Sequence, residues 1–444
     1  MTMPEHAVPE GMISAPAIDT RPKGAHLVQM ALVVLGISLV TLAREAFFPL
    51  QPFIQHSMAL SNQQVALLQG LAIGLPEAVL LVVFGIMSDS VARHYMMRLF
   101  VTTCIAGVVL TGLAPGFVSL LCARFLVGVG YAGACAVVMP YIADLAPVPW
   151  RGRALAAVFI GQIVSNTIGM DLGANLLPVI DHSAWRHVFP ATMEAWRIEH
   201  IVAAAAMLLL TLPLLRLVEP RKTPAKRGRF LPRLRSTFQD LLQFRRVLLP
   251  VVTAFTLFSA AEIEQQIWSV PLLAKTAQLS VETVSGALGS VLLISSILGV
   301  LIGGALCDRT FARYGNTGAV LAMLACYILD LVTSLTTFAH PFALALGLYG
   351  LDMVLYTVSQ LYGYRLILDI IGSRHAGAGY GMINGLSILV SMGIMPSLVV
   401  AVSSHLPGDA ALNWAVGVSR FACVLIASLI LTLMATRSRR PQDT

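Results

Sequence analysis

Two long apolar runs meet at the stretch Gly85-Ile86-Met87-Ser88-Asp89-Ser90-Val91-Ala92-Arg93. A related stretch, Gly304-Ala305-Leu306-Cys307-Asp308-Arg309, begins 219 residues later and is followed by Arg313. The same offset relates further positions without a gap: Glu45 and Glu264, Pro52 and Pro271, Leu60-Ser61 and Leu279-Ser280, and Gly70 and Gly289. So many coincidences in one register indicate an internal duplication, so we expect two copies of one structural half.

The composition indicates that most of this chain lies in a lipid bilayer. Hydrophobic residues make up 57% of the 444 residues and charged residues only 11%, whereas a soluble domain has about 25% charged residues. The net charge is +7, but the cations gather in loops and tails, without a basic patch interleaved with aromatic residues. We therefore expect lipid as a partner and no nucleic acid.

The sequence contains none of the common catalytic or cofactor motifs. The six cysteines lie in or beside apolar runs and none forms Cys-x-x-Cys, so we expect neither a metal site nor a disulfide. Gly-x-x-x-x-Gly-Lys-Ser/Thr, His-Glu-x-x-His and Gly-x-Ser-x-Gly are absent. These absences disfavour an enzyme, a cofactor, and ATP as a source of energy.

Twelve segments are long and apolar enough to cross a bilayer, which takes about 20 residues each. They begin near Leu27, Val65, Met96, Phe117, Ala154, Trp196, Val247, Val284, Gly318, Phe342, Ala376 and Leu412. With the duplication, this count predicts an all-α membrane protein of twelve transmembrane helices in two pseudo-symmetric six-helix bundles.

Charge in the loops predicts the domain limits and the orientation. Arginine and lysine gather on one side, including both tails and the whole 216–246 segment, while the opposite loops hold only Arg186, Lys275 and the boundary residue Arg197. The positive-inside rule then places both termini in the cytoplasm of a cell that carries the protein in its plasma or inner membrane. The predicted parts are a disordered tail (1–25), a first bundle (26–218), a basic linker (219–246), a second bundle (247–437) and a short tail (438–444).

Four motifs in order resemble the major facilitator superfamily of secondary transporters. The two duplicated loops, Gly85-x-x-x-Asp89 with Arg93 and Gly304-x-x-x-Asp308-Arg309 with Arg313, are similar to its signature loop. The other two are Arg124-x-x-x-Gly128-x-Gly130-x-x-Gly133 and Asp144-x-x-Pro147-x-x-Trp150-Arg151-Gly152-Arg153. The resemblance implies the major facilitator fold, transport by alternating access and a monomer.

Some positions point to one branch of the family, and others depart from the family pattern. The stretch from Leu60 to Ala72 and the Arg44-Glu45 pair resemble the spinster-like branch, although Tyr131 lies in a region where that branch carries an acidic residue. Ser90 replaces a usual basic residue and Ala92 a usual glycine, so the first signature loop has a weaker charge cluster than its copy.

The signature loops are candidates for a gate. Glycine lets helices approach closely, and aspartate at a helix end can accept hydrogen bonds from a neighbouring helix N-terminus. Turn chemistry alone also favours glycine and aspartate, so a gate and a simple tight turn both stay open. The candidate gate residues are Gly85, Asp89, Arg93, Asp144, Arg151, Arg153, Gly304, Asp308, Arg309 and Arg313.

Charges within the apolar segments point to a central site, because an ionised side chain at the bilayer centre costs about 3 kcal/mol. The repeat relates Glu45 to Glu264, so we expect both to face one shared cavity. Desolvation disfavours an ionised carboxyl group and a nearby arginine favours it, so Glu45, Glu77 or Glu264 is a candidate coupling acid. Structural ion pairs and helix packing remain the alternative for these residues. The candidate cavity residues are Arg44, Glu45, Glu77, Arg124, Tyr131, Gln162, Asn166, Glu262, Glu264, Gln265, Trp268, Tyr356, Gln360 and Asn384.

These features predict a secondary active transporter that moves a small organic solute by proton-coupled symport. The basic residues make an organic anion one candidate, unless neighbouring acids neutralise them. Efflux of drugs or amphiphiles, or lipid transport, is the alternative within the same fold. A membrane receptor that does not transport is a third possibility, and fold analogy alone does not separate these.

Overall fold

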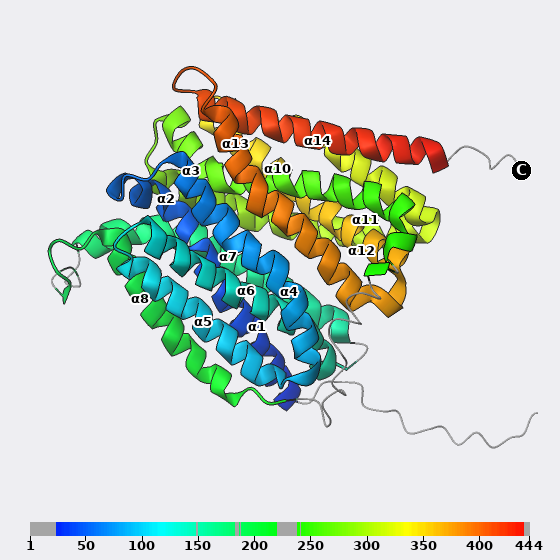
Figure 1. The fold of residues 1–444 in the computed structure, drawn as a ribbon, viewed down its shortest axis with the longest axis horizontal. Helices are drawn as coiled ribbons and strands as arrows, with labels where there is room; N and C mark the ends of the chain where they lie inside the picture. Colours follow the sequence, from blue (N-terminus) through cyan, green and yellow to red (C-terminus); the bar gives the residue numbers. More distant parts are fainter. Residues whose placement is uncertain are drawn as a thin grey trace, which may run out of the picture.

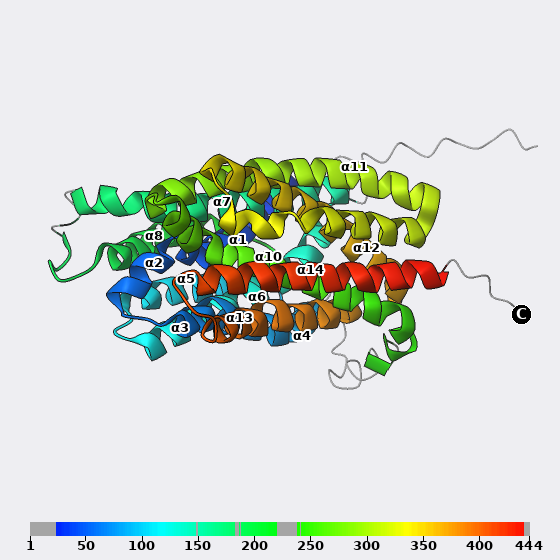
Figure 2. The ribbon, with the colours of Figure 1, turned by 90° about the horizontal axis from the view of Figure 1, so that it is seen from above.

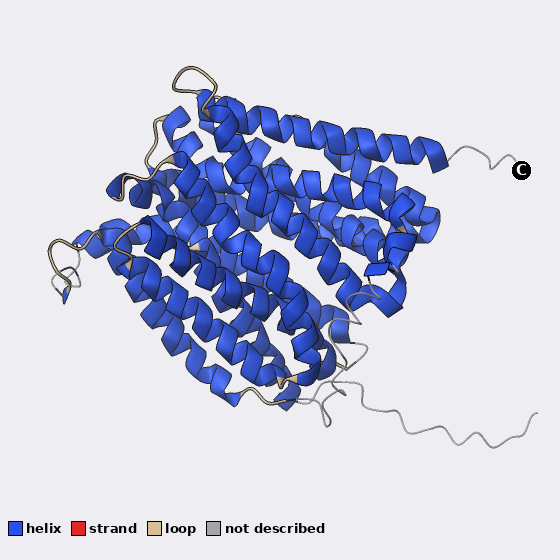
Figure 3. Ribbon diagram, viewed as in Figure 1, coloured by secondary structure: helices blue, strands red, loops and turns tan. Residues whose placement is uncertain are grey.

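The computed structural model describes residues 24–147, 150–182, 186, 188–219, 238–239 and 241–438. Within its helices, the side chains at 89–90, 151–152, 171–174, 181, 372–380 and 437–438 lie outside this description. The predicted tails and most of the predicted linker also lie outside it. Among the described residues there are helices and connecting loops but no strands (Figure 3).

The first half of the chain forms the elements α1 (Gly24–Glu45), α2 (Phe47–Ser57), α3 (Asn62–Ala66), η1 (Leu67–Leu71), α4 (Ala72–Ser90), α5 (Arg93–Leu113), α6 (Phe117–Leu145), α7 (Arg151–His182), α8 (Ala195–Thr211) and η4 (Leu212–Arg216). The second half forms α10 (Arg245–Ala277), α11 (Val281–Asp330), η5 (Thr333–Phe338), α12 (Phe342–Ile388), η6 (Leu389–Ile394), α13 (Met395–Ser403) and α14 (Ala411–Ser438).

The number of membrane crossings agrees with the prediction of twelve. Eleven helical runs in the described part are long and apolar enough to span a bilayer, and one of them, Val281–Phe338, has 58 residues. A straight helix of that length would extend about 87 Å, almost three times the hydrocarbon thickness. Gly315 interrupts it with a left-handed φ of 55°, so this run crosses twice.

The two halves of the chain occupy different sides of the molecule. Helices α1 to α8 lie toward the lower left of Figure 1 and α10 to α14 toward the upper right. Seen from above, the long helices run roughly along a common direction (Figure 2). The exact limits of the two bundles stay a prediction, because the linker falls mostly outside the described residues.

Three apolar cores hold the helices together. The first core lies almost wholly in the first half, around Phe100 and Val127. The second lies in the second half, around Phe255 and Tyr327. A third, which we call the shared core, joins both halves through side chains that include Phe47, Ile54, Trp196, Trp268, Tyr349 and Val399.

The shared core lies at the end of the bundle away from the described chain termini. Its members come from α2, from the start of α8, from the second part of α10 and from α13, which all reach that end. Toward the start of α1 and the end of α14, the two groups of helices diverge in Figure 1. The halves therefore share a core at one end, and their helices diverge toward the other.

The duplication is visible in local structure. Ser61 caps α3, where its Oγ accepts a hydrogen bond from the backbone N–H of Gln64 at 3.2 Å. Its repeat partner Ser280 caps α11 in the same way, accepting from the N–H of Thr283 at 3.3 Å. A serine at the N-cap satisfies a backbone donor that has no partner within the helix, so the two halves begin equivalent helices identically.

Two irregular helical segments bring the halves close together. The π-helical η1 contains Gly70 and the π-helical η6 contains Gly393. A Cβ atom added at Gly70 would lie 2.6 Å from the Met392 carbonyl oxygen, and one at Gly74 would lie 3.0 Å from the Gly393 nitrogen. Only residues without a side chain permit this backbone approach, and π-helical insertions often occur at functional sites.

Candidate functional site

A cavity of about 520 Å³ lies between the two halves. Its walls come from α1, α4, α6 and α7 of the first half and from α10, α12 and η6 of the second. Its polar lining comprises Arg44, Glu77, Tyr131, Ser259, Tyr356, Gln360, Tyr364, Asn384, Ser387 and Ser391. A concave site with an apolar wall and a few convergent polar groups is typical of small-molecule binding.

Helical spacing explains how these side chains reach one space. On α12, Tyr356, Gln360, Tyr364 and Leu368 follow one another at intervals of four residues and all line the cavity. Side chains at that spacing lie on one helix face. Tyr131, Cys135 and Met139 repeat the pattern on α6. The shared spacing turns one face of each helix toward the cavity.

Arg44 is the cation of the cavity lining, and its contacts cross between the halves. Its Nε lies 3.6 Å from Glu45 Oε1, and its guanidinium carbon lies 4.7 Å from the centre of the Tyr131 ring. Its Nη2 contacts the sulfur of Met392 in the other half at 3.3 Å. The charge of Arg44 is thus partly balanced by protein groups before any ligand is present.

Glu77 supplies the acidic group of the same lining. Only 8% of its surface is exposed, and its Oε2 is buried without a hydrogen-bond partner. Arg44 lies close enough to interact electrostatically with it. The kink residue Pro76 directly precedes Glu77 in α4, and its ring lies at Gly128 of α6, where an added Cβ would approach it to 2.6 Å.

Glu45 and Arg124 form a buried layer behind the cavity rather than part of its lining. Arg124 donates from its two terminal nitrogens to the Arg44 carbonyl oxygen, at 3.3 and 3.4 Å, and its guanidinium stacks 4.4 Å from the centre of the Phe47 ring. The break between α1 and α2 at Ala46 leaves the end of α1 open to such donors. Pro49 explains the break, because it has no N–H to donate to the carbonyl of Glu45.

The predicted residues of α10 also lie off the cavity. Ser259 and Ile263 of α10 face it, one helical turn apart. Because each residue turns a helix by about 100°, Glu264 points elsewhere, and it is 1% exposed with neither carboxylate oxygen partnered. Trp268 is packed in the shared core. The expectation that Glu45 and Glu264 both face the cavity therefore differs from the structure.

Of the predicted cavity residues, six line it: Arg44, Glu77, Tyr131, Tyr356, Gln360 and Asn384. Eight do not: Glu45, Arg124, Gln162, Asn166, Glu262, Glu264, Gln265 and Trp268. Gln162 and Asn166 are half-buried on α7. Ser259 and Tyr364 were missed, although the four-residue spacing of Tyr364 from Gln360 is a signal that finds it.

The signature loops carry ion pairs that stay within one half. Arg93 of α5 hydrogen-bonds and ion-pairs with Asp144 of α6, and its backbone N–H donates to Glu219 at 2.6 Å. In the second half, Arg365 of α12 pairs with Asp308 of α11 at 2.8 Å. Each pair therefore ties together neighbouring helices of the same bundle.

Within the described residues, the glycines of the two loops touch no other helix. A Cβ atom added at Gly85 or Gly304 would meet nothing within 4 Å, in contrast to the close approach that the sequence predicts. Both lie at the end where the halves separate, which explains the free space. Arg309 and Arg313 are exposed and Arg153 stacks 4.7 Å over the Trp150 ring. The side chains of Asp89 and Arg151 lie outside the described part.

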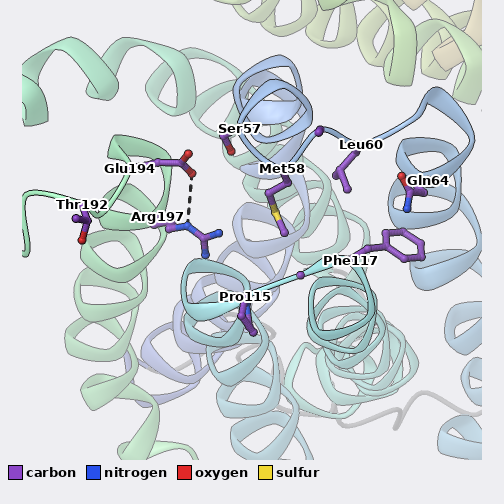
Figure 4. Close-up of a pocket in the computed structure, with 11 residues that line it drawn as sticks. Ser57, Met58, Leu60, Gln64, Pro115, Phe117, Thr192, Glu194 and Arg197 are labelled. Carbon is purple, nitrogen blue, oxygen red and sulfur yellow. Dashed lines mark ion pairs between the residues drawn. The ribbon is translucent and has the colours of Figure 1, made fainter.

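A second hollow, of about 360 Å³, lies within the first half at the shared-core end. Figure 4 shows its lining, with Arg197 Nε paired to Glu194 at 3.5 Å. Arg197 also donates to the Ala114 carbonyl oxygen at 2.6 Å, which ties α8 to the end of α5. Because this lining comes from the first half alone, the hollow does not join the two bundles.

Comparison with known proteins identifies a family and its fold. The model of the family described as Major Facilitator Superfamily matches residues 33–396. A bacterial homologue of the human lysosomal transporter Spinster, in an inward-facing and unoccupied conformation, superposes with a TM-score of 0.76 at 18% identity, covering 96% of this chain and all of that one. The nucleoside transporter NupG superposes with a TM-score of 0.69 at 12% identity, covering 92% and 99%.

Two curated relatives match over shorter stretches. Myo-inositol transporter 2 of Cryptococcus neoformans is 31% identical over 111 residues, or 24% of this chain and 20% of that protein. Polyol transporter 5 of Arabidopsis thaliana is 22% identical over 207 residues, or 46% of this chain and 35% of that protein. This chain thus aligns with about a fifth to a third of the length of these relatives.

Proposed function

This chain belongs to the major facilitator superfamily, and we propose that it carries a small, neutral, polyhydroxylated solute together with protons, binding the solute in the cavity between its halves. It is a multi-pass membrane transporter rather than an enzyme. The solute class, the coupling to protons and the orientation are the parts that we propose.

The chemistry of the cavity supports a neutral solute. Its polar wall offers amides from Gln360 and Asn384 and hydroxyl groups from several serines and tyrosines, which suit a molecule rich in hydroxyl groups. The opposite charges of Arg44 and Glu77 occur in the same lining, and Arg44 already pairs with Glu45. This neutralisation weakens the case for an organic anion. The polyol and inositol transporters among the relatives support the same solute class.

The distribution of the apolar cores supports a state open on one side. The shared core closes the cavity toward the end away from the termini, while the other two cores each lie within one half, apart from Met392 in the first. If loop charge places the termini in the cytoplasm, this state faces inward. Rocking the halves about the shared cavity would expose it to the other side.

Glu77 is the cavity acid that we propose to exchange protons with the solute site. Its carboxyl group is buried at the lining and one oxygen has no partner. Burial of an unpaired carboxyl favours its neutral form, and a wetter or more cationic surrounding favours ionisation. Alternating access changes those surroundings, which gives a physical route to coupling.

The observation that carries the proposal is one polar cavity lined by both halves and closed at one end. The test is uptake of radiolabelled myo-inositol into proteoliposomes with an inside-alkaline pH gradient. We expect accumulation that an uncoupler abolishes, and a loss of at least tenfold in Glu77→Gln and Gln360→Ala. Gln162 is a polar residue of α7 outside the lining, so Gln162→Ala is the control and should keep uptake. No uptake of any polyol or sugar by folded wild-type protein would reject the solute class.

Efflux of amphiphiles is the second candidate, and one feature favours it. The same cavity has an apolar wall formed by Leu81, Met139, Phe159, Phe255, Leu368 and Met392. Such a wall suits an acyl or aromatic group. Inhibition of myo-inositol uptake by amphiphiles, with outward movement of a labelled amphiphile, would favour this alternative. A protein that moves neither class would be the non-transporting receptor.

A further inference from the structure

A second group of charges lies inside the second half, away from the lining of the central cavity. Glu262 of α10, Asp330 at the end of α11, Asp352 of α12 and Arg420 of α14 are each between 1% and 2% exposed. They come from four different helices, and none of them lines the cavity. We call these four residues the acidic cluster.

Arg420 donates four hydrogen bonds, one to a carboxylate and three to neutral oxygens. Its Nη2 bonds Asp352 Oδ2 at 3.0 Å, and its Nε donates to the Ala261 carbonyl oxygen at 3.1 Å. Its Nη1 donates to the Gln265 side chain and, at 3.4 Å, to the Thr333 carbonyl oxygen. Of the three acids, Asp352 alone forms an ion pair with Arg420 among the pairs found in the described residues.

The remaining acids lack a cation of their own. Glu262 Oε1 accepts from Gln266 at 3.0 Å, but its Oε2 is buried without a partner. Asp330 Oδ1 accepts from Thr333 Oγ1 at 2.8 Å, and neither Glu262 nor Asp330 forms an ion pair within the part of the chain that the structure describes. A buried carboxyl group without a compensating cation is favoured in its protonated form.

The charge balance leads to the same conclusion. Three carboxylates around one guanidinium would leave two negative charges uncompensated in a region without water contact. Isolated buried charges are strongly disfavoured, and such groups take up a proton instead. Within the described residues, no group of three or more histidine, cysteine or acidic side chains has the arrangement of a metal site. Protons therefore suit the cluster better than a metal ion.

We propose that Glu262, Asp330 and Asp352, arranged around Arg420, form a proton-binding site separate from the solute cavity. Proton binding at this site does not depend on the proposed function, whereas its role in coupling rests on that function.

Two tyrosines of α12 share a helix face with Asp352 of the cluster. Tyr356, which lines the cavity, lies one helical turn after Asp352, and Tyr349, in the shared core, lies one turn before it. Hydroxyl groups both donate and accept hydrogen bonds, so they can relay a proton. The other ionisable groups near the cluster are Cys326 and Tyr327 beside Asp330, and Glu264 beside Arg420.

Infrared spectroscopy tests the site directly, because a protonated carboxyl group has a C=O stretch that a carboxylate lacks. We expect purified wild-type protein at pH 7 to show this band, and Asp330→Asn and Glu262→Gln each to lower its intensity. Glu282→Gln, at the half-buried start of α11 outside the cluster, is the control and should not change it. Thermal unfolding of each variant checks that it is folded, and Asp352→Asn replaces any variant that is not.

Three results would overturn the proposal. The first is a wild-type spectrum without a protonated carboxyl band at pH 7. The second is an unchanged band in the folded cluster variants. The third is loss of the band when Na⁺ replaces K⁺ in the buffer, which would make this a cation site.

Transport measurements then test the coupling role of the site separately from the proposed function. Folded cluster variants should still exchange labelled for unlabelled myo-inositol across the membrane, but should lose at least tenfold of the accumulation driven by a pH gradient. Band changes with no gradient-driven accumulation by the wild type would keep the proton site and reject proton-coupled uptake. Normal gradient-driven accumulation in the cluster variants would instead reject the coupling role.

Discussion

Ala59 and Gln278, which lie 219 positions apart, both hold left-handed backbone, with φ of 49° and 53°. Each residue precedes by two positions a serine that caps the next helix, Ser61 or Ser280. For a residue with a side chain, this conformation is unfavourable by about 1 kcal/mol or more. The same local strain in both halves shows that the sharp turn is required at equivalent places, and that the duplication extends to backbone geometry.

We expect Ala59→Gly and Gln278→Gly to stabilise the protein by up to about 1 kcal/mol each, because glycine adopts a positive φ without steric cost. The measurement is the thermal unfolding temperature in detergent. Ala106→Gly, at an exposed position inside α5, is the control and should lower that temperature. Equal destabilisation at all three positions would contradict a strained turn at Ala59 and Gln278.

The solute cavity predicts a specific effect of Asn384. Its amide lines the cavity on the second half, and a hydrogen bond to a solute hydroxyl is worth about 1 kcal/mol. Asn384→Ala should therefore raise the KM for myo-inositol about five- to tenfold with little change in stability. Asn413→Ala is the matched control, because Asn413 bonds to Thr276 at 3.2 Å, outside the cavity. An equal effect of both variants would argue against a solute contact at Asn384.

Alanine should have different effects on stability at the interface glycine Gly70 and at the signature-loop glycines Gly85 and Gly304. Gly70→Ala should destabilise this state by about 2 kcal/mol, since a methyl group would lie 2.6 Å from the Met392 carbonyl oxygen. An added methyl group at Gly85 or Gly304 meets nothing within 4 Å, so Gly85→Ala and Gly304→Ala should raise the unfolding temperature slightly, because alanine favours a helix over glycine.

The same pair of variants separates the gate from a simple turn. If the signature loops close against neighbouring helices in the opposite state, Gly85→Ala and Gly304→Ala should slow transport several-fold although their stability is not reduced. Normal transport rates in both variants would favour the turn alone.

The two loop ion pairs should differ in strength. Arg93 is 5% exposed, so Asp144→Asn removes a carboxylate from a buried cation and should cost about 3 kcal/mol. Asp308 and Arg365 have side chains that are 83% and 42% exposed, and Asp308→Asn should cost less than about 1 kcal/mol. Unfolding temperatures in detergent compare them directly, and a larger loss for Asp308→Asn would contradict this ranking.

The fold was largely predictable because it depends on features that are local in the chain. Apolar length sets each membrane crossing, and the Gly85 and Gly304 loops reveal the duplication without any contact information. The one run that merged two crossings in the structure, Val281–Phe338, is divided by Gly315. Serine caps such as Ser61 are likewise local signals.

The cavity was predictable only in part. Glu77, Tyr356 and Gln360 were found because buried polar groups in apolar helices are informative by themselves. The repeat suggested that Glu264 should accompany them. Repeat symmetry relates positions along the chain, but it does not fix how each helix is rotated about its own axis toward the cavity.

Sequence alone therefore determined the membrane class, the twelve crossings and the two related halves, because hydrophobic length and periodic repetition are written along the chain. Tertiary structure decided which side chains share a space. The orientation of α1 sets Arg44 at the cavity while Glu45, turned by about 100°, lies behind it, and the packing of four helices gathers three acids around Arg420. These relations depend on the rotation and separation of packed helices, which side-chain packing between distant segments sets and local sequence does not encode.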